Sequence, residues 1–242
     1  MGQRVIALAA DDPDFHIVAA IDDAEHRSVG KDVGSVAGTA LLNVLLSGDW
    51  PKSAGVVVDF SLPSAVDDCI ANCVEANIPL VLATTGLSQQ QKDLLGEAAK
   101  SIPIVWAPSM SMAVNLTMKL SQLAAKALSD QDADVEILER HHRFKADSPS
   151  GTALKFGQII ADEMGQTVHR HGREGQCGAR PHGEIGYHAI RVGEIPGEHT
   201  IVFAMLGETV ELTVRASNRD CYALGALAAA KFLVGKPAGL YG

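Results

Sequence analysis

Four short apolar runs alternate with amphipathic stretches in the first half of the chain, and this alternation constrains the fold most. The runs span residues 16–21, 55–60, 79–83 and 102–107. Helix-like stretches span 64–77 and 88–100. Continuous apolar runs of this length are typical of strands buried on both faces. Strands that alternate with helices predict a parallel sheet, with ligands beyond the carboxyl ends of its strands.

The second half has a different pattern. Helical periodicity at about 113–128 precedes an apparent strand at 135–139, and a further helix is expected from about 151 to 164. Three strand-like segments then follow one another closely, as in an antiparallel sheet, at 185–192, 199–206 and 208–215. An Ala-rich helix at about 221–234 closes the chain.

These two patterns predict two domains. We expect a Rossmann-like α/β nucleotide-binding domain over residues 1–110, completed by 218–242. Residues 111–217 are expected to form an α+β domain with an open mixed sheet, which binds the substrate and supports oligomerisation.

Composition excludes several classes of partner. The formal net charge of −9 disfavours non-specific binding to nucleic acid or to an anionic membrane. No apolar run is long enough to span a bilayer, and the acidic residues after the first apolar stretch do not fit a signal peptide. The four cysteines have no zinc-like spacing and require no oxidising compartment. The prediction is a cytoplasmic enzyme.

The segment from Glu139 to Thr152 carries the strongest chemical signal. Possible proton donors and cations follow the end of a strand: His141, His142, Arg143 and Lys145. The sequence Ser-Pro-Ser-Gly-Thr at 148–152 then opens a helix, with a serine as N-cap and the proline in the first turn. Exposed N–H groups at a helix start bind carboxylate or phosphate, and a histidine can supply a proton near neutral pH. The pattern predicts a site for an anion that is protonated.

Two other interpretations of this segment stay open. The histidines can be ordinary surface residues near a strand end, although two adjacent histidines and a lysine before such a helix start disfavour that interpretation. A metal site is the weaker rival, because adjacent residues on a strand point to opposite faces and rarely bind one ion. No metal is expected.

The same segment resembles the dihydrodipicolinate reductase family, whose members are also named 4-hydroxy-tetrahydrodipicolinate reductases. The family pattern E-x-H-H-x-x-K-x-D-x-P-S-G-T-A is met at every fixed position from Glu139 to Ala153. Further matching segments, which extend the resemblance along nearly the whole chain, lie at 58–61, 84–86, 107–108, 173–175, 185–187, 191–193, 197–199 and 239–241.

The resemblance implies a reductase that transfers a hydride to a cyclic unsaturated dicarboxylate in lysine and diaminopimelate biosynthesis, with protonation of the neighbouring atom. It implies that His141 and Lys145 are catalytic, and that His142, Gly151 and Thr152 bind the substrate carboxylates. It places NADH or NADPH against Asp22, Ala83, Thr84, Thr85, Ala107, Pro108, Ser109 and Met110. It also implies a homotetramer.

Two acidic residues after the first apolar run bear on the choice of nucleotide. Asp22 can accept hydrogen bonds from an adenosine ribose. Its neighbour is Asp23 rather than a cation, so a 2′-phosphate would meet like charge. The sequence therefore predicts a preference for NADH, with a simple turn after the strand as the alternative role of these residues.

The chain departs from the family pattern at its start and in one loop. Residues 1–4 match the end of the Gly-rich turn, so the first strand and most of that turn are absent. We expect Met1 to be an internal methionine of a longer chain, the alternative being a truncated chain with poor nucleotide affinity. Ser109 and Ala113 stand where the family commonly has Asn and Gly. The alternative function is therefore a non-catalytic dicarboxylate-binding protein that has lost nucleotide binding.

Overall fold

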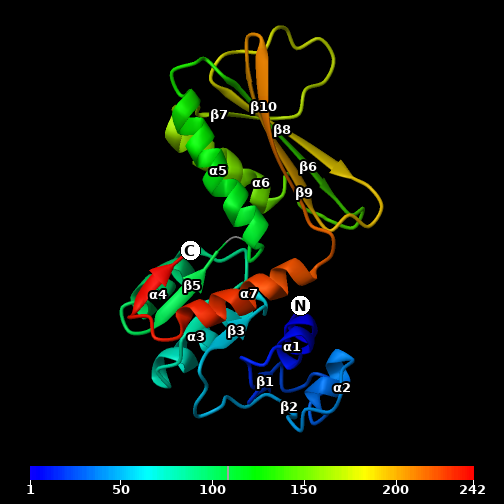
Figure 1. The fold of residues 1–242 in the computed structure, drawn as a ribbon, viewed down its shortest axis with the longest axis vertical. Coiled ribbons are helices and arrows are strands. Elements are labelled where there is room, and N and C mark those ends of the chain that lie inside the picture. The colour runs from blue at the N-terminus through cyan, green and yellow to red at the C-terminus, as the bar shows by residue number, and fades with distance from the viewer. Residues whose placement is uncertain (108) are drawn as a thin grey trace. The chain divides into compact units, whose positions relative to one another are not determined.

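The computed structural model describes residues 1–107 and 109–242, which form two compact units. Unit 1 comprises Met1–Ser111 together with Asp220–Gly242, and unit 2 comprises Met112–Arg219. Figure 1 shows that the last helix and strand belong with the first part of the chain.

Unit 1 is built on a four-stranded parallel sheet with the order β11-β5-β4-β3. Its strands are β3 (Val57–Asp59), β4 (Leu80–Leu82), β5 (Pro103–Trp106) and β11 (Gly239–Tyr241). Neighbouring strands are parallel throughout, and Asp59, Leu82 and Trp106 lie in register. The predicted parallel sheet is confirmed, and its carboxyl ends form one edge.

Helices cover both faces of this sheet. The helices of unit 1 are α1 (Gly2–Ala10), α2 (Val33–Ala37), the short 3-10 helix η1 (Pro63–Ala65), α3 (Val66–Glu75), α4 (Gln89–Ala98) and α7 (Asp220–Leu233). Leu80 and Leu82 of β4 pack into the core with α3 and α4, whereas Val81 packs with α7. Burial on both faces explains why these strands are continuous apolar runs.

The strand predicted at 16–21 is largely wrong. Only Ala20–Ile21 (β1) is a strand, and it pairs in parallel with Leu46–Ser47 (β2) in a separate two-stranded sheet. Val18 is half-exposed, and no described residue of the four-stranded sheet pairs with this segment. Because the rest of this apolar run has no neighbouring strand among the described residues to pair with, it forms strand hydrogen bonds only where it meets β2.

Unit 2 is a five-stranded mixed sheet with the order β10-β9-β6-β8-β7. Its strands are β6 (Asp134–His141), β7 (Val168–His171), β8 (Glu184–Arg191), β9 (Glu198–Met205) and β10 (Glu208–Arg215). Helices α5 (Met112–Leu128) and α6 (Gly151–Met164) pack against it, side by side in Figure 1. The predicted open mixed sheet is confirmed.

One expected strand pairing in unit 2 is wrong. The segments at 199–206 and 208–215 form the antiparallel hairpin β9–β10, but β8 does not join it as an antiparallel neighbour. Strand β8 instead lies parallel between β6 and β7. Helix α6 supplies the crossover connection that parallel strands need. The close spacing of the three segments in the sequence gives no sign of this parallel arrangement.

The start of α6 also differs in detail from the prediction. Ser150 is its N-cap, and its side chain accepts a hydrogen bond from the backbone N–H of Ala153. Pro149 therefore precedes the helix instead of occupying its first turn.

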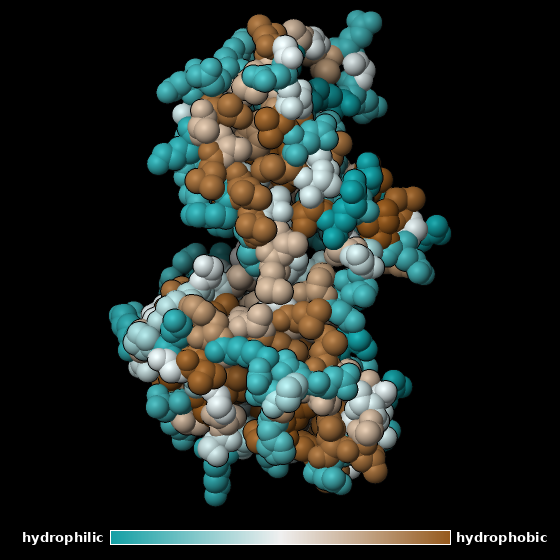
Figure 2. Space-filling view, in the orientation of Figure 1, coloured by the Kyte–Doolittle hydropathy of each residue, from teal (hydrophilic) through white to brown (hydrophobic). Residues whose placement is uncertain are grey.

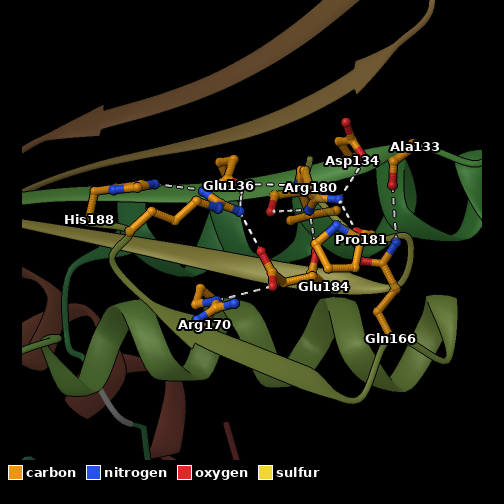
Figure 3. A network of polar contacts seen from close by, with 11 residues as sticks. Ala133, Asp134, Glu136, Gln166, Arg170, Arg180, Pro181, Glu184 and His188 are labelled. Carbon is orange, nitrogen blue, oxygen red and sulfur yellow. Dashed lines mark hydrogen bonds and ion pairs between the residues drawn. The ribbon is translucent and has the colours of Figure 1, made fainter. Parts of the chain in front are cut away.

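The face of β6 and β8 turned away from the helices carries a network of charged side chains (Figure 3). Glu136 of β6 accepts hydrogen bonds from Arg173, Arg180 and His188. Glu184 of β8 pairs with Arg173 at 2.5 Å. The arginines come from the loop between β7 and β8, so this network fixes the loop to the sheet.

Candidate functional site

Period-two alternation along β6 brings Glu139 and His141 to the face that the helices cover. Val135 and Ile137 of the same strand face are fully buried in the core. Glu139 is 1% exposed and His141 is 7% exposed, and their side chains lie 2.6 Å apart, from Oε2 to Nδ1. A carboxylate only accepts hydrogen bonds, so the proton on neutral His141 is on Nδ1. Its Nε2 is then the nitrogen that exchanges a proton.

Arg191 at the end of β8 completes this pair. Its two terminal nitrogens donate to the two oxygens of Glu139 at 2.7 and 2.8 Å. One of them also donates to the backbone carbonyl of Asp147 at 2.7 Å. Such bidentate pairing suits the planar guanidinium and orients both groups. Arg191 therefore links the strand end to the loop that leads into α6.

Ser150 connects the same carboxylate to the start of α6. Its backbone N–H donates to Glu139 Oε1 at 3.0 Å. Its Oγ lies 3.0 Å from Nε2 of His199, and the His199 ring meets that of His141 edge-on, with ring centroids 5.3 Å apart. His141 and the start of α6 are thus held by one group, Glu139.

The surroundings set the charge of these groups. Burial is the largest effect on His141 and lowers its pKa, and the positive charges of Lys145 and Arg191 lower it further, so the pKa lies below its ordinary value although the hydrogen bond and charge of Glu139 raise it. Burial alone would raise the pKa of Glu139, but hydrogen bonds from Arg191 and His141 bring it below its ordinary value. Burial lowers the pKa of His199 to about 4. At neutral pH, Glu139 is therefore a carboxylate and both histidines are mainly neutral.

Four predicted substrate-facing residues lie around this centre. Lys145 Nζ is 2.8 Å from Asp147 Oδ1, and the Lys145 backbone N–H closes a turn on the carbonyl of His142. Nε2 of His142 is 3.5 Å from Arg219, while its buried Nδ1 has no hydrogen-bond partner among the described residues. This part of the site combines cations with an imidazole nitrogen that no described side chain satisfies.

Gly151 and Thr152 form the first turn of α6. Within the described part of the chain, no hydrogen bond occupies their backbone N–H groups, as expected at a helix start. A Cβ added at Gly151 would meet no atom within 4 Å, so open space adjoins the helix start. The helix dipole and the free donors favour a carboxylate there.

The predicted nucleotide-binding loops gather in unit 1 at the carboxyl edge of the parallel sheet. Ala83, Thr84 and Thr85 follow β4, while Ala107, Ser109 and Met110 follow β5. Pro108 was also predicted to bind nucleotide but lies outside the described residues. The position of these loops is the one expected for a nucleotide site, because ligands of parallel sheets bind at this edge.

Thr84 has a more specific place than the sequence indicated. Its hydroxyl donates to Asp59 Oδ2 at 2.6 Å and also lies 3.1 Å from the carbonyl of Ser61. Its side chain is almost fully buried, whereas Thr85 is exposed. The Thr84 side chain therefore ties the loops after β3 and β4 together, and Asp59 is a residue that the sequence prediction missed.

Asp22 follows β1 in the two-stranded sheet, apart from the strands that carry the other loops. It is exposed, and its carboxylate accepts the backbone N–H of Asp23 at 2.8 Å. A surface hollow of about 480 Å³ lies elsewhere in unit 1 and contains none of the predicted nucleotide-binding residues. Its lining includes Gln3, Arg27 and Lys31. None of the described residues after β4 and β5 lines this hollow, so the sheet edge is the better candidate for the predicted nucleotide site.

Sequence reasoning missed the groups that hold His141. Arg191, His199 and Arg219 come from strand ends or loops far along the chain, and only the fold brings them to Glu139, Ser150 and His142, respectively. The segments 191–193 and 197–199, which match the family pattern, contained a signal for the first two. Among the residues that the structure describes, no three His, Cys, Asp or Glu side chains form a metal-ligand group.

Comparison with known proteins agrees along the whole chain. A family model described as the N-terminus of dihydrodipicolinate reductase matches residues 1–110, and one described as its C-terminus matches 113–242. The 4-hydroxy-tetrahydrodipicolinate reductase of Rhodopirellula baltica is 60% identical over 251 residues, covering all of this chain and 90% of the relative. The corresponding enzyme of Alkalilimnicola ehrlichii is 42% identical, covering all of this chain and 92% of the relative.

Solved structures support the same fold. A dipicolinate-bound dihydrodipicolinate reductase from Paenisporosarcina sp. TG-14 matches with a TM-score of 0.78 at 24% identity, over 99% of this chain and 92% of that one. A probable dehydrogenase from Thermotoga maritima matches with a TM-score of 0.60 at 12% identity, over 98% of this chain and 87% of that one. With both family models matched and a relative 60% identical over the whole of this chain, this chain belongs to the dihydrodipicolinate reductase family.

Proposed function

We propose that this chain is an NAD(P)H-dependent oxidoreductase that reduces 4-hydroxy-tetrahydrodipicolinate, or its dehydrated form, to tetrahydrodipicolinate in lysine and diaminopimelate biosynthesis. The observation that carries the proposal is the attachment of His141 and the start of α6 to the Glu139 carboxylate. A proton-handling histidine and a carboxylate-binding helix start are thereby held in one place. The family relatives that match the full chain bear the same activity in their names.

The substrate is a dianion, and the residues around α6 supply what it needs. The backbone N–H groups of Gly151 and Thr152 bind one carboxylate, and His142 and Lys145 bind the other. Lys145, as the second catalytic residue, also offsets the negative charge near His141. In the neighbouring Glu139 and Arg191, opposite charges cancel, so Lys145, which is itself paired with Asp147, is the cation proposed to turn toward the substrate.

His141 delivers the proton of the reaction. In the imidazolium form, Nε2 of His141 gives its proton to the carbon next to the atom that accepts the hydride. The proton on Nδ1 stays there and remains hydrogen-bonded to Glu139. Reduced nicotinamide supplies the hydride when bound. Hydride and proton together account for the two hydrogens that the substrate gains, and His141 returns to its neutral form.

The loops after β4 and β5 would hold the nucleotide. Ala83 and Thr85 offer backbone and side-chain groups at the sheet edge, while Thr84 keeps that loop in place through Asp59. Ala107, Pro108, Ser109 and Met110 are proposed to lie at the nicotinamide. The corresponding division of the chain is a nucleotide-binding part over 1–110 completed by 218–242, and a substrate-binding part over 111–217.

NADH is the proposed preferred nucleotide. Asp22 and Asp23 are both exposed at the end of β1, where their charge would repel a 2′-phosphate. Arg27 and Lys31 lie further along the same segment and border the surface hollow. These two cations would favour NADPH instead. The preference therefore depends on whether the two aspartates or the two cations face the adenosine ribose.

A homotetramer is the proposed assembly. Helix α5 exposes an apolar stripe of Met112, Leu116, Leu120 and Leu123. Figure 2 draws hydrophobic residues over the region where Figure 1 places this helix. Apolar surface of this kind is usual at subunit contacts. Native mass spectrometry tests the assembly, and a monomer at all concentrations would contradict it.

No helix among the described residues is long and apolar enough to cross a membrane. A cytoplasmic location stays a prediction, which fractionation of cells that produce the protein would test.

Two measurements test the function. The first is steady-state oxidation of NADH and NADPH with 4-hydroxy-tetrahydrodipicolinate and a panel of other cyclic dicarboxylates. We expect turnover with the first substrate only. The second is calorimetry with NADH and with dipicolinate. Binding of dipicolinate without any binding of NADH or NADPH would favour the alternative, a non-catalytic dicarboxylate-binding protein.

A further inference from the structure

We propose that Glu139 and Arg191 act as an opposed positioning pair for His141. Glu139 fixes the ring proton on Nδ1 and favours the imidazolium form of His141. Arg191 holds the Glu139 carboxylate and limits how strongly that carboxylate stabilises the imidazolium. Neither residue touches the substrate. The proposal rests on the proposed catalytic role of His141, and its test separates the two.

The carboxylate of Glu139 is held on both oxygens. Oε1 accepts from the Ser150 backbone N–H at 3.0 Å and from Arg191 at 2.8 Å. Oε2 accepts from His141 Nδ1 at 2.6 Å and from Arg191 at 2.7 Å. Rotation of the carboxylate would break all four hydrogen bonds, so it presents a fixed acceptor to the imidazole. The His141 ring is thereby held in one orientation and one tautomer.

The pair is also buried beside the ring. Glu139 is 1% exposed, and the side chain of Arg191 is 20% exposed. A buried carboxylate without a cation would be costly and would bind a proton more tightly. Arg191 prevents this, and its positive charge also opposes protonation of His141. The two residues therefore act on the imidazole in opposite directions.

Other charged or titratable groups face the same ring. Lys145, from the loop after β6, opposes protonation of His141. His199 of β9 meets the His141 ring edge-on and has a pKa of about 4, so it is neutral above that pH. Asp147 pairs with Lys145 at 2.8 Å and reduces the effect of that cation. Among the described residues, Glu139 alone accepts a hydrogen bond from His141, which makes it the dominant stabiliser of the imidazolium.

An ordinary structural ion pair predicts something different. If Glu139 and Arg191 only joined β6 to β8, removal of either partner would lower stability and leave the titration of His141 unchanged. A positioning pair predicts opposite changes. Glu139→Gln removes the stabilising charge and leaves that of Arg191, so the pKa of His141 falls. Arg191→Met leaves the Glu139 charge without its cation, so the pKa of His141 rises.

The experiment is ¹⁵N NMR of the histidine rings in the full-length protein across pH, with the pH profile of kcat/KM measured on the same variants. We expect wild-type His141 to carry its proton on Nδ1. We expect Glu139→Gln to add the other tautomer and lower kcat between about 10- and 100-fold with little change in KM, because general acid–base catalysis contributes about 10²–10⁴-fold. Arg191→Lys should restore most of the wild-type titration.

Two controls keep the outcome clear. Arg140→Met removes an ion pair with Glu198 from the opposite face of β6, and it should leave His141 unchanged. His141→Gln tests the proposed function itself, since full activity of that variant would remove His141 from the mechanism whatever the NMR result. The positioning pair is wrong if Glu139→Gln and Arg191→Met shift the His141 titration in the same direction, or if neither shifts it in folded protein.

Discussion

Arg191 lies opposite His141 in the parallel ladder of β6 and β8, and both side chains bind the carboxylate of Glu139. The register of β6 and β8 thus places a buried ion pair, Glu139 with Arg191, directly beside the proposed proton donor. The Ser150 N–H on the same carboxylate extends it to the helix start that is proposed to bind substrate. The site is therefore organised around a residue that is not itself proposed to react.

The activity should fall as the pH rises. The proposed proton donor is the imidazolium form of His141, whose pKa lies below its ordinary value of 6.5 because of burial and the nearby cations. The value of kcat/KM reports the free enzyme, so it should decrease with a slope of one above an apparent pKa lower than 6.5. Initial rates at low substrate from pH 5 to 9 measure this. A profile that rises through this range would exclude His141 as the acid.

Gly151→Ala should weaken substrate binding without loss of stability. The added methyl group meets no protein atom but enters the space beside the proposed carboxylate site. We expect KM to rise about tenfold and Tm to stay the same or increase, since alanine favours a helix over glycine by about 1 kcal/mol.

Gly157→Ala in the same helix is the matched control. Its methyl group would collide with the Tyr187 hydroxyl, so it should destabilise unit 2 by about 1–3 kcal/mol. An unchanged KM in Gly151→Ala, with thermal unfolding as the folding check, would place the carboxylate elsewhere.

Glu136 should contribute stability that acid removes. Burial would raise its pKa, but hydrogen bonds from Arg173, His188 and Arg180 outweigh burial and bring the pKa to about 2, against an ordinary 4.5. A depressed carboxyl pKa stabilises the folded state above pH 4.5, and this contribution is lost as the pH falls toward 2. Its size is of the order of 2–3 kcal/mol.

Denaturant unfolding of wild type and Glu136→Gln at pH 7 and pH 3 tests this point. The difference in free energy of unfolding between wild type and Glu136→Gln should be smaller at pH 3 than at pH 7. Glu208→Gln, at an exposed position that starts β10, should show no such change. A gap that is equal at both pH values would mean that the network in Figure 3 does not control the acid stability.

The two carboxylates after β1 should set the nucleotide preference. Asp23→Arg replaces a repelling charge with a cation, so we expect the ratio of kcat/KM for NADPH to that for NADH to rise at least tenfold. Substitution of Arg27 and Lys31 by glutamine should leave the ratio unchanged. A wild-type protein that strongly prefers NADPH, and loses that preference in the double glutamine variant, would assign the 2′-phosphate to the surface hollow.

Prediction from sequence succeeded where burial leaves a clear apolar run in the sequence. The strands at 57–59, 80–82 and 103–106 are apolar because helices cover both of their faces. Strand β7 was missed because all four of its residues are exposed and its sequence, Val-His-Arg-His, has no apolar period. The parallel placement of β8 was missed because strand spacing along the chain does not encode which strands become neighbours.

The candidate site was predictable only in its local part. The spacing of Glu139 and His141 already places them on one face of β6, since alternate residues of a strand share a face. The bidentate contact from Arg191 and the hydrogen bond between His199 and Ser150 depend on β8 and β9, which are distant in sequence. The proposed reacting groups could therefore be predicted from the sequence, whereas the fold was needed to find the groups that orient them.

The steady-state kinetics of His141→Gln beside wild type test the central claim most directly, with 4-hydroxy-tetrahydrodipicolinate as substrate and NADH as reductant. Wild type should turn over, and the variant should lose at least about 100-fold in kcat with KM within about threefold, because the substitution removes a transition-state role and leaves the carboxylate contacts. Equal kcat in the two proteins, or no NADH oxidation by wild type, would contradict the account.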